Sequence, residues 1–221
     1  ILKQTGSVFS SLSSDITLSV VRNSDEVQSA EFSAFVEDIA SVSDRISTVC
    51  QEGERFSFSI LRNGKATGIS FRGIPNGHEF TSLLLAILNA DGQGKNLPDE
   101  AVAARIKALK GEIRLRTYVS LTCTNCPDVV QALNVMALIN PDISHEMVDG
   151  GLYQDEIERL GIQGVPAVYV NGEPLHVGRG DLGVLLQELE DKVGTDHDGE
   201  AVQPVRTYDV LVLGGGPAGV S

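Results

Sequence analysis

The strongest restriction on the fold of this chain is an order of predicted elements that occurs twice. Each half has the pattern of strand, helix and strand, followed by two strands joined at Asn-Gly and a final helix. The first hairpin begins with Phe-Ser-Phe-Ser-Ile at 56–60 before Asn-Gly at 63–64, and the second with Pro-Ala-Val-Tyr-Val at 166–170 before Asn-Gly at 171–172. Strands that alternate with helices imply a sheet packed between helices, so we predict an α/β protein with a duplicated unit. The alternative is a chance likeness between two ordinary α/β segments.

The spacing of apolar residues gives each element an expected range. Strands are expected over 16–21, 46–50, 56–60, 69–71, 113–119, 143–148 and 167–170, and helices within 1–14 and over 26–42, 79–89, 101–109, 124–139, 154–160 and 182–193. The second half thus has one extra helix before its hairpin. These ranges divide the chain into units at 1–110 and 111–194, a polar, glycine-containing linker at 195–207 and a separate segment at 208–221.

Composition excludes several classes of function. The 221 residues carry 17 Lys+Arg against 30 Asp+Glu, a net charge of −13, which disfavours nucleic-acid binding. No apolar run reaches the ~18–20 residues that a membrane-spanning helix needs. The start, Ile1-Leu2-Lys3-Gln4, is not the basic segment followed by an apolar core that a signal peptide has, and three Cys are too few for a disulfide-built scaffold. We therefore expect a cytoplasmic globular protein without nucleic-acid or membrane partners.

Cys123-Thr-Asn-Cys126 is the motif that carries chemistry. It follows a predicted strand and opens a predicted helix, the context in which a Cys-x-x-Cys pair is redox-active. The two-residue gap places both sulfurs on the first helical turn, close enough to bridge, and the positive end of the helix dipole favours the Cys123 thiolate. Because the thiolate attacks disulfides, we predict Cys123 as the nucleophile and Cys126, deeper in the helix, as the resolving thiol.

Two other interpretations of the cysteine pair are an inert pair and half of a zinc site. Zinc normally needs four ligands, and the chain offers only Cys50 and four scattered His besides the pair. We predict no metal site.

Pro166 is a second candidate site residue, because it directly precedes the strand expected at 167–170. In thioredoxin-like folds a cis-proline at this place faces the dithiol; it has no N–H and lets the backbone of a partner approach the sulfurs. We predict a cis Val165–Pro166 bond, with an ordinary trans proline at a strand start as the alternative. The first half has Phe56 at the matching place and Ser-Asp-Glu-Val-Gln-Ser at 24–29 instead of the cysteine pair. Only the second half is therefore expected to exchange thiols.

Glu79 is a third candidate, at the start of the most apolar helix expected in the first half. The plain interpretation is an acid in the first turn that interacts with the helix dipole. The sharper interpretation places Glu79 across the cleft between the two units, near the dithiol, where a carboxylate could take or give protons during exchange.

Gly214, Gly216 and Gly219 form a Gly-x-Gly-x-x-Gly turn after an apolar run at 208–213, the arrangement of a dinucleotide-binding turn. The helix that should follow is not reached before Ser221. We interpret this segment as the first strand and turn of a truncated FAD-binding Rossmann domain, which binds no cofactor in this form.

Four stretches of the chain together resemble one bacterial family. They are Gly-His-Glu-Phe-Thr-Ser-Leu at 77–83, Cys-Thr-Asn-Cys-Pro-Asp-Val-Val-Gln-Ala-Leu-Asn at 123–134, Gly-Val-Pro-Ala-Val-Tyr-Val-Asn-Gly at 164–172 and Tyr-Asp-Val at 208–210, which leads into the glycine turn. On these residues the chain resembles, from residue 16 onward, the F component of bacterial alkyl hydroperoxide reductase. It departs from that family in the Thr-Asn dipeptide between the cysteines, in Phe56 and in the residues before 16.

The resemblance implies two fused thioredoxin-like folds, with Cys123 and Cys126 as their single dithiol and Glu79 as the acid of the first fold. In the full family protein, the remainder binds FAD and NADH or NADPH and carries a second dithiol. Electrons pass from there to the N-terminal dithiol and then to the peroxiredoxin subunit that destroys peroxides. The resemblance therefore predicts an oxidoreductase domain that relays electrons from its own C-terminal flavoprotein domain to a peroxiredoxin.

Two other functions stay open. One is a free-standing, glutaredoxin-like protein disulfide oxidoreductase, against which the glycine turn argues. The other is a non-catalytic docking module with a structural cysteine pair. A homodimer is compatible with the sequence, which gives neither the redox state of the pair nor its reduction potential.

Overall fold

The structure, a computed structural model, describes residues 2–22, 29–94 and 97–196. Its strands are β1 (Ile16–Arg22), β2 (Ile46–Glu52), β3 (Ser57–Arg62), β4 (Lys65–Arg72), β5 (Ile113–Val119), β6 (Ile143–Asp149), β7 (Ala167–Val170) and β8 (Glu173–Val177). Its helices are α1 (Leu2–Phe9), α2 (Ser29–Ser41), the 3-10 helix η1 (Gly77–Glu79), α3 (Phe80–Ala90), α4 (Glu100–Lys107), α5 (Cys126–Ile139), α6 (Gln154–Leu160) and α7 (Leu182–Val193). Gly214, Gly216 and Gly219 lie outside the described residues, as does most of the predicted linker.

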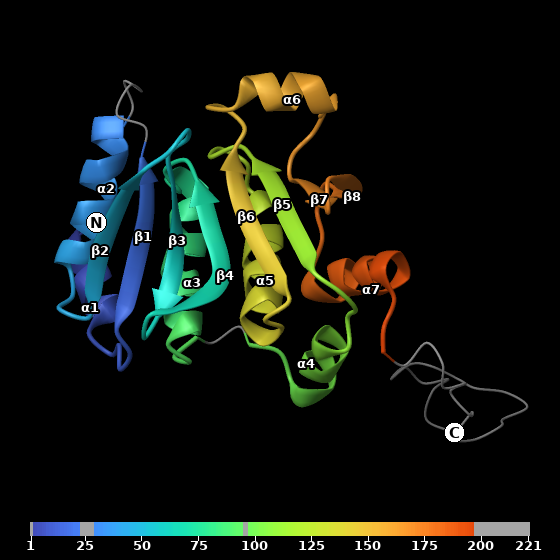
Figure 1. The fold of residues 1–221 in the computed structure, drawn as a ribbon, viewed down its shortest axis with the longest axis horizontal. Coiled ribbons are helices and arrows are strands. Elements are labelled where there is room, and N and C mark those ends of the chain that lie inside the picture. Colours follow the sequence, from blue (N-terminus) through green and yellow to red (C-terminus); the bar gives the residue numbers. More distant parts are fainter. Residues whose placement is uncertain (1, 23–28, 95–96, 197–221) are drawn as a thin grey trace, which may run out of the picture.

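The eight strands form one continuous sheet in the order β2-β1-β3-β4-β6-β5-β7-β8 (Figure 1). In each half, the first two strands pair in parallel and the other two continue antiparallel, so the predicted order of elements is confirmed. The halves meet where β4 and β6 pair in parallel, from Ile69 opposite His145 to Arg72 opposite Val148. The boundary near residue 110 stays a prediction, since the sheet crosses it without a break.

Alternating side chains give the sheet one apolar face. In β5, Ile113 and Leu115 are buried whereas Arg114 and Arg116 are exposed, as period-two alternation requires. Figure 1 shows α2, α3 and α5 together behind one face of the sheet. The buried side chains that this face contributes are Ile16, Leu18, Val20, Phe58, Ile60, Ile69, Phe71, Ile113, Leu115 and Met147. None of the described helices has the length and apolar character needed to cross a membrane.

A buried histidine ties α5 to this face. The Nδ1 atom of His145 lies 2.7 Å from the side-chain oxygen of Asn134 in α5, and its Nε2 atom lies 2.8 Å from the hydroxyl of Thr117 in β5. Because an amide oxygen only accepts, Nδ1 carries the proton and Nε2 accepts from Thr117. Burial lowers the pKa of His145 to about 3, so the ring stays neutral near pH 7.

A buried ion pair joins the two halves. Arg72 of β4 donates two hydrogen bonds to Glu156 of α6, at 2.7 and 2.8 Å, and Tyr118 of β5 donates a third at 2.8 Å. The Arg72 guanidinium also lies 4.6 Å from the centre of the Tyr153 ring. Burial alone would raise the pKa of Glu156, but the hydrogen bonds from Arg72 and Tyr118 and the nearby guanidinium charges lower it to about 2. The carboxylate therefore stays ionised and fixes α6 of the second half to β4 of the first.

Replacing Glu156 with Gln should destabilise the protein strongly, because it removes the closest counter-charge of the buried Arg72 guanidinium and leaves only Glu146, 3.5 Å away. We expect a loss of about 3–5 kcal/mol in the free energy of unfolding at pH 7, measured by urea denaturation. Asp15→Asn is the matched control, since it breaks the exposed Arg45–Asp15 pair and should cost less than about 1 kcal/mol.

The contribution of Glu156 should also depend on pH in a defined direction. Its folded-state pKa of about 2 lies below the ordinary 4.5, so its stabilisation is complete above pH 4.5 and is lost as the pH falls towards 2. The difference between wild type and Glu156→Gln should therefore narrow in acid. Equal costs for Glu156→Gln and Asp15→Asn at pH 7 would contradict the assigned role.

Candidate dithiol site

The two predicted redox cysteines meet between β5 and α5. Cys123 and Cys126 form a disulfide, with Cα atoms 5.6 Å apart. The expectation that both lie on the first helical turn is wrong for Cys123, because α5 begins only at Cys126. Pro127 explains the later start: a helix that began at 124 would need the N–H that proline lacks, whereas a start at 126 places Pro127 among positions whose N–H has no partner in the helix.

The later start places the Cys123 sulfur at the tip of the helix. The backbone N–H of Cys126 points at the Cys123 sulfur, 3.2 Å away, and such an unused helix N–H stabilises a thiolate. Cys126 is 0% exposed whereas Cys123 is half-buried. Cys123 is thus the more exposed of the two cysteines, as the predicted division into an attacking and a resolving thiol requires.

Pro166 lies beside this sulfur. The Val165–Pro166 peptide bond is cis, so that prediction is confirmed. The carbonyl oxygen of Val165 lies 3.8 Å from the Cys123 sulfur, and the carbonyl oxygen of Pro166 accepts a hydrogen bond of 2.8 Å from the N–H of Gly178. The backbone before β7 therefore forms one wall of the site.

Glu79 reaches the same region from the first half. Its side chain is 0% exposed, and within the described residues neither carboxylate oxygen has a hydrogen-bond partner. Burial raises the pKa of Glu79 to about 7, with Ser82 lowering it slightly in opposition. The turn η1 that carries this acid contacts α5, the helix that begins with Cys126, so Glu79 is not in an exposed first turn. Among the described residues, however, no hydrogen bond joins the Glu79 carboxylate to either sulfur.

A close backbone contact, which the sequence did not reveal, holds the Glu79 turn against the dithiol loop. The N–H of His78 donates to the carbonyl oxygen of Leu121, 3.1 Å away and two residues before Cys123. Gly77 has φ +55°, and a Cβ atom there would lie 2.5 Å from the same oxygen. Only glycine allows this approach without a shift of the backbone.

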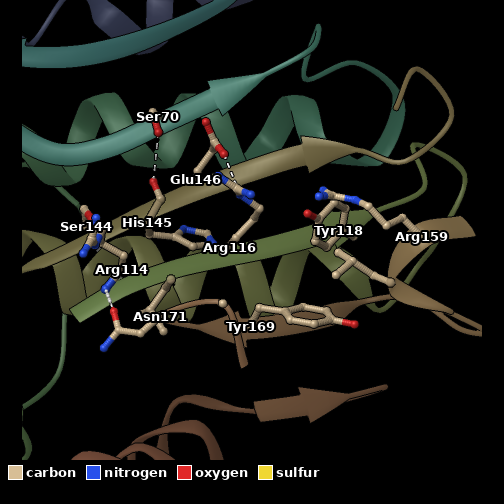
Figure 2. A pocket seen from close by; sticks show the side chains of 13 residues that line it. Ser70, Arg114, Arg116, Tyr118, Ser144, His145, Glu146, Arg159, Tyr169 and Asn171 are labelled. Carbon is tan, nitrogen blue, oxygen red and sulfur yellow. Dashed lines mark hydrogen bonds and ion pairs between the residues drawn. The ribbon is translucent and has the colours of Figure 1, made fainter. Parts of the chain in front are cut away.

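A side-chain hollow over β5 and β6 lies away from the dithiol. Figure 2 shows this hollow of about 630 Å³, with Arg114, Arg116 and Tyr169 among its lining residues. Arg116 already pairs with Glu146 at 2.8 Å, and none of the predicted site residues lines the hollow. Across residues 2–22, 29–94 and 97–196, no cluster of three or more His, Cys, Asp or Glu is placed to hold a metal ion.

Comparison with known proteins places this geometry in a family. Residues 113–189 match the family described as thioredoxin domain. The N-terminal domain of alkylhydroperoxide reductase AhpF from Enterococcus faecalis superposes with a TM-score of 0.78 at 30% identity, over 85% of this chain and 97% of that one. The chain belongs to the AhpF family, the F component of alkyl hydroperoxide reductase.

Other relatives of this AhpF family chain are longer than it is. The F component of alkyl hydroperoxide reductase from Pseudomonas aeruginosa is 44% identical over 202 residues, which are 89% of this chain and 38% of that protein. A Bacillus subtilis protein named NADH dehydrogenase is 44% identical over 211 residues, 95% of this chain and 40% of that protein. The chain thus spans about 40% of these curated relatives. A protein disulfide oxidoreductase from Aeropyrum pernix shares the fold, with a TM-score of 0.77 at 18% identity.

Glu79 gives this AhpF family chain a stability that should fall between pH 4.5 and 7. Its folded-state pKa of about 7 lies above the ordinary 4.5, so the folded state favours the neutral acid and loses stability as the pH rises. Across that interval the loss amounts to about 3 kcal/mol. Glu79→Gln should remove this dependence and be more stable than wild type at pH 8, measured by urea denaturation.

The exposed Glu100, in the first turn of α4, provides the control. Glu100→Gln should leave the pH dependence of stability unchanged. If Glu79→Gln and Glu100→Gln gave the same profile, the carboxylate of Glu79 would not be a buried, unpaired acid.

Proposed function

We propose that this chain is the N-terminal dithiol–disulfide relay domain of a peroxiredoxin reductase. The observation that carries the proposal is the partly buried Cys123 just before α5, bonded to fully buried Cys126 and bordered by the cis bond before Pro166. A thioredoxin-like fold with such a pair is built for disulfide exchange. The Cys123–Cys126 disulfide in this structure is the oxidised form of the pair, the form that accepts electrons.

In the reduced state, the Cys123 thiolate attacks one sulfur of a partner disulfide. A mixed disulfide forms, the partner's sulfur–sulfur bond breaks, and the released thiolate takes up a proton. Cys126 then loses its proton and attacks the Cys123 sulfur, which restores the Cys123–Cys126 disulfide and frees the second partner thiol. One electron pair passes to the partner in each cycle. The Cys126 N–H that points at the Cys123 sulfur lowers the cost of the attacking thiolate.

Glu79 suits the role of proton carrier in this cycle. A group with a pKa of about 7 is populated in both protonation states near neutral pH, and Glu79 is buried against the helix that carries Cys126. We therefore assign it the proton that Cys126 releases and regains.

Family membership supports the choice of partner. We propose that the acceptor is the peroxiredoxin subunit of an alkyl hydroperoxide reductase, in the cytoplasm, and that the donor is the chain's own C-terminal flavoprotein domain. In the full-length protein, FAD with NADH or NADPH supplies the electron pair, and Gly214, Gly216 and Gly219 form part of the FAD site. A free-standing disulfide oxidoreductase has the support of the Aeropyrum pernix fold alone, at 18% identity. The accessible Cys123 sulfur disfavours a purely structural cysteine pair.

Cysteine variants test the relay. After reduction with dithiothreitol and its removal, the wild-type chain should reduce an oxidised alkyl hydroperoxide-reducing peroxiredoxin in one turnover. Cys126→Ser should stop at the mixed disulfide, because the resolving thiol is gone, and Cys123→Ser should form no covalent complex. Non-reducing electrophoresis and mass spectrometry detect the complex.

Cys50→Ser is the matched control, since Cys50 is an exposed free cysteine of β2 in the other half. It should behave as wild type. Reduction of the peroxiredoxin by Cys123→Ser at the wild-type rate would rule out the proposed role of this sulfur.

A further inference from the structure

His176 of β8 is held between two hydrogen-bond acceptors. Its side chain is 10% exposed, and its Nδ1 atom lies 3.1 Å from both carboxylate oxygens of Glu188 in α7. Its Nε2 atom lies 3.1 Å from the carbonyl oxygen of Gly178. A carboxylate and a carbonyl only accept, whereas a neutral imidazole has a single N–H. Only the imidazolium form donates to both partners, and a neutral ring would turn a lone pair towards one of them.

Gly178, the hydrogen-bond partner of His176, is also hydrogen-bonded to Pro166 beside the dithiol. Gly178 accepts from His176 through its carbonyl oxygen, and through its N–H it donates to the carbonyl oxygen of Pro166 at 2.8 Å. Val165, directly before Pro166, has its carbonyl oxygen 3.8 Å from the Cys123 sulfur. A short path of bonded groups therefore joins the imidazole to the backbone beside the reactive sulfur.

The turn after β8 is closely fitted to this ring. Gly178 has φ +95°, and a Cβ atom at Gly180 would lie 2.8 Å from the Nε2 atom of His176. Among the charged groups on the packed elements, α7 contributes Glu188, which bonds the ring, and Asp181, which caps α7 through the N–H of Val184. On the sheet side, β7 places uncharged Val168 opposite His176, and Arg179 is exposed in the turn. Glu188 is thus the counter-charge that the structure sets against an imidazolium.

We propose that His176 is a positioning residue for the dithiol site, acting in its imidazolium form through Gly178 and Pro166. This inference rests on the proposed disulfide exchange. Loss of the ring proton at rising pH removes one of the two hydrogen bonds, which frees either Gly178 or the contact between β8 and α7. The backbone beside Cys123 is then held less firmly. The rate of disulfide exchange per Cys123 thiolate falls as a result.

Nuclear magnetic resonance of the full 221-residue chain tests the protonation state without any redox partner. Nitrogen shifts of the His176 ring should show both nitrogens protonated at the acidic end of a titration between about pH 5 and 8. The Gly178 amide shift and its hydrogen-exchange rate should change with the same midpoint as the ring. A ring nitrogen that stays unprotonated throughout that range would overturn the proposal. A Gly178 amide shift that does not change when the ring changes its protonation would overturn it too.

Exchange kinetics test the consequence. The reduced chain is mixed with a small aromatic disulfide across the same pH range, and the rate of wild type is divided by that of His176→Gln, whose amide side chain cannot become doubly protonated. We expect a ratio of about two- to tenfold in acid, the worth of one hydrogen bond, falling to one as the ring deprotonates. A merely structural role would give a ratio that does not change with pH, and that result would refute the proposal.

Two carboxylates of α7 supply matched variants. Glu188→Gln removes the hydrogen-bonded counter-charge of the ring and should lower the acid-side rate of exchange. Glu190→Gln, which removes a partner of Arg105 instead, should leave that rate unchanged. If wild type exchanges thiols but the ratio is flat, the role of His176 is wrong and the relay stands. If wild type exchanges no thiols at all, the relay fails, and the ring shifts still decide the imidazolium.

Discussion

The parallel pairing of β4 with β6 is the interaction on which the rest of this molecule depends. It merges two four-stranded sheets into one and brings the first half's η1 against α5 of the second. The buried Arg72–Glu156 ion pair is a second connection between the halves, because it joins β4 of the first to α6 of the second. The dithiol site is therefore assembled from both halves, although only the second half carries its cysteines.

Two buried glutamates end with opposite pKa shifts, and the difference lies in their partners. Glu156 receives hydrogen bonds from Arg72 and Tyr118, so it stays ionised down to a pKa of about 2. Glu79 has no such cationic donor among the described residues, so desolvation dominates and its pKa rises to about 7. Glu156 thus stays negatively charged where the two halves meet. Glu79, the same type of side chain, can gain or lose a proton near neutral pH in the turn beside α5.

Local patterns predicted most of the elements, the proximity of Cys123 to Cys126 and the cis bond before Pro166. Alternation and helical spacing reveal the strands and helices because those periods are properties of short segments, and the cysteine pair and Pro166 are recognisable from their immediate neighbours. The start of α5 was predicted two residues too early, at 124 instead of 126, although Pro127 restricts where a helix can begin. The contact of Arg72 with Glu156, 84 residues away, could not be predicted, because nothing in either segment specifies the other. The contacts of Gly77 with Leu121 and of His176 with Glu188 escaped prediction for the same reason.

A sheet without a break has a mechanical consequence for the described part of the chain. Two lobes joined by a single strand of polypeptide can swing about that connection, but eight hydrogen-bonded strands cannot bend at one point without breaking a row of backbone bonds. The continuous sheet therefore restrains the spacing between the Glu79 turn and the cysteine pair. In the proposed disulfide exchange, adjustment to a protein partner falls to the loops at the end of the sheet, above all the two that border the Cys123 sulfur.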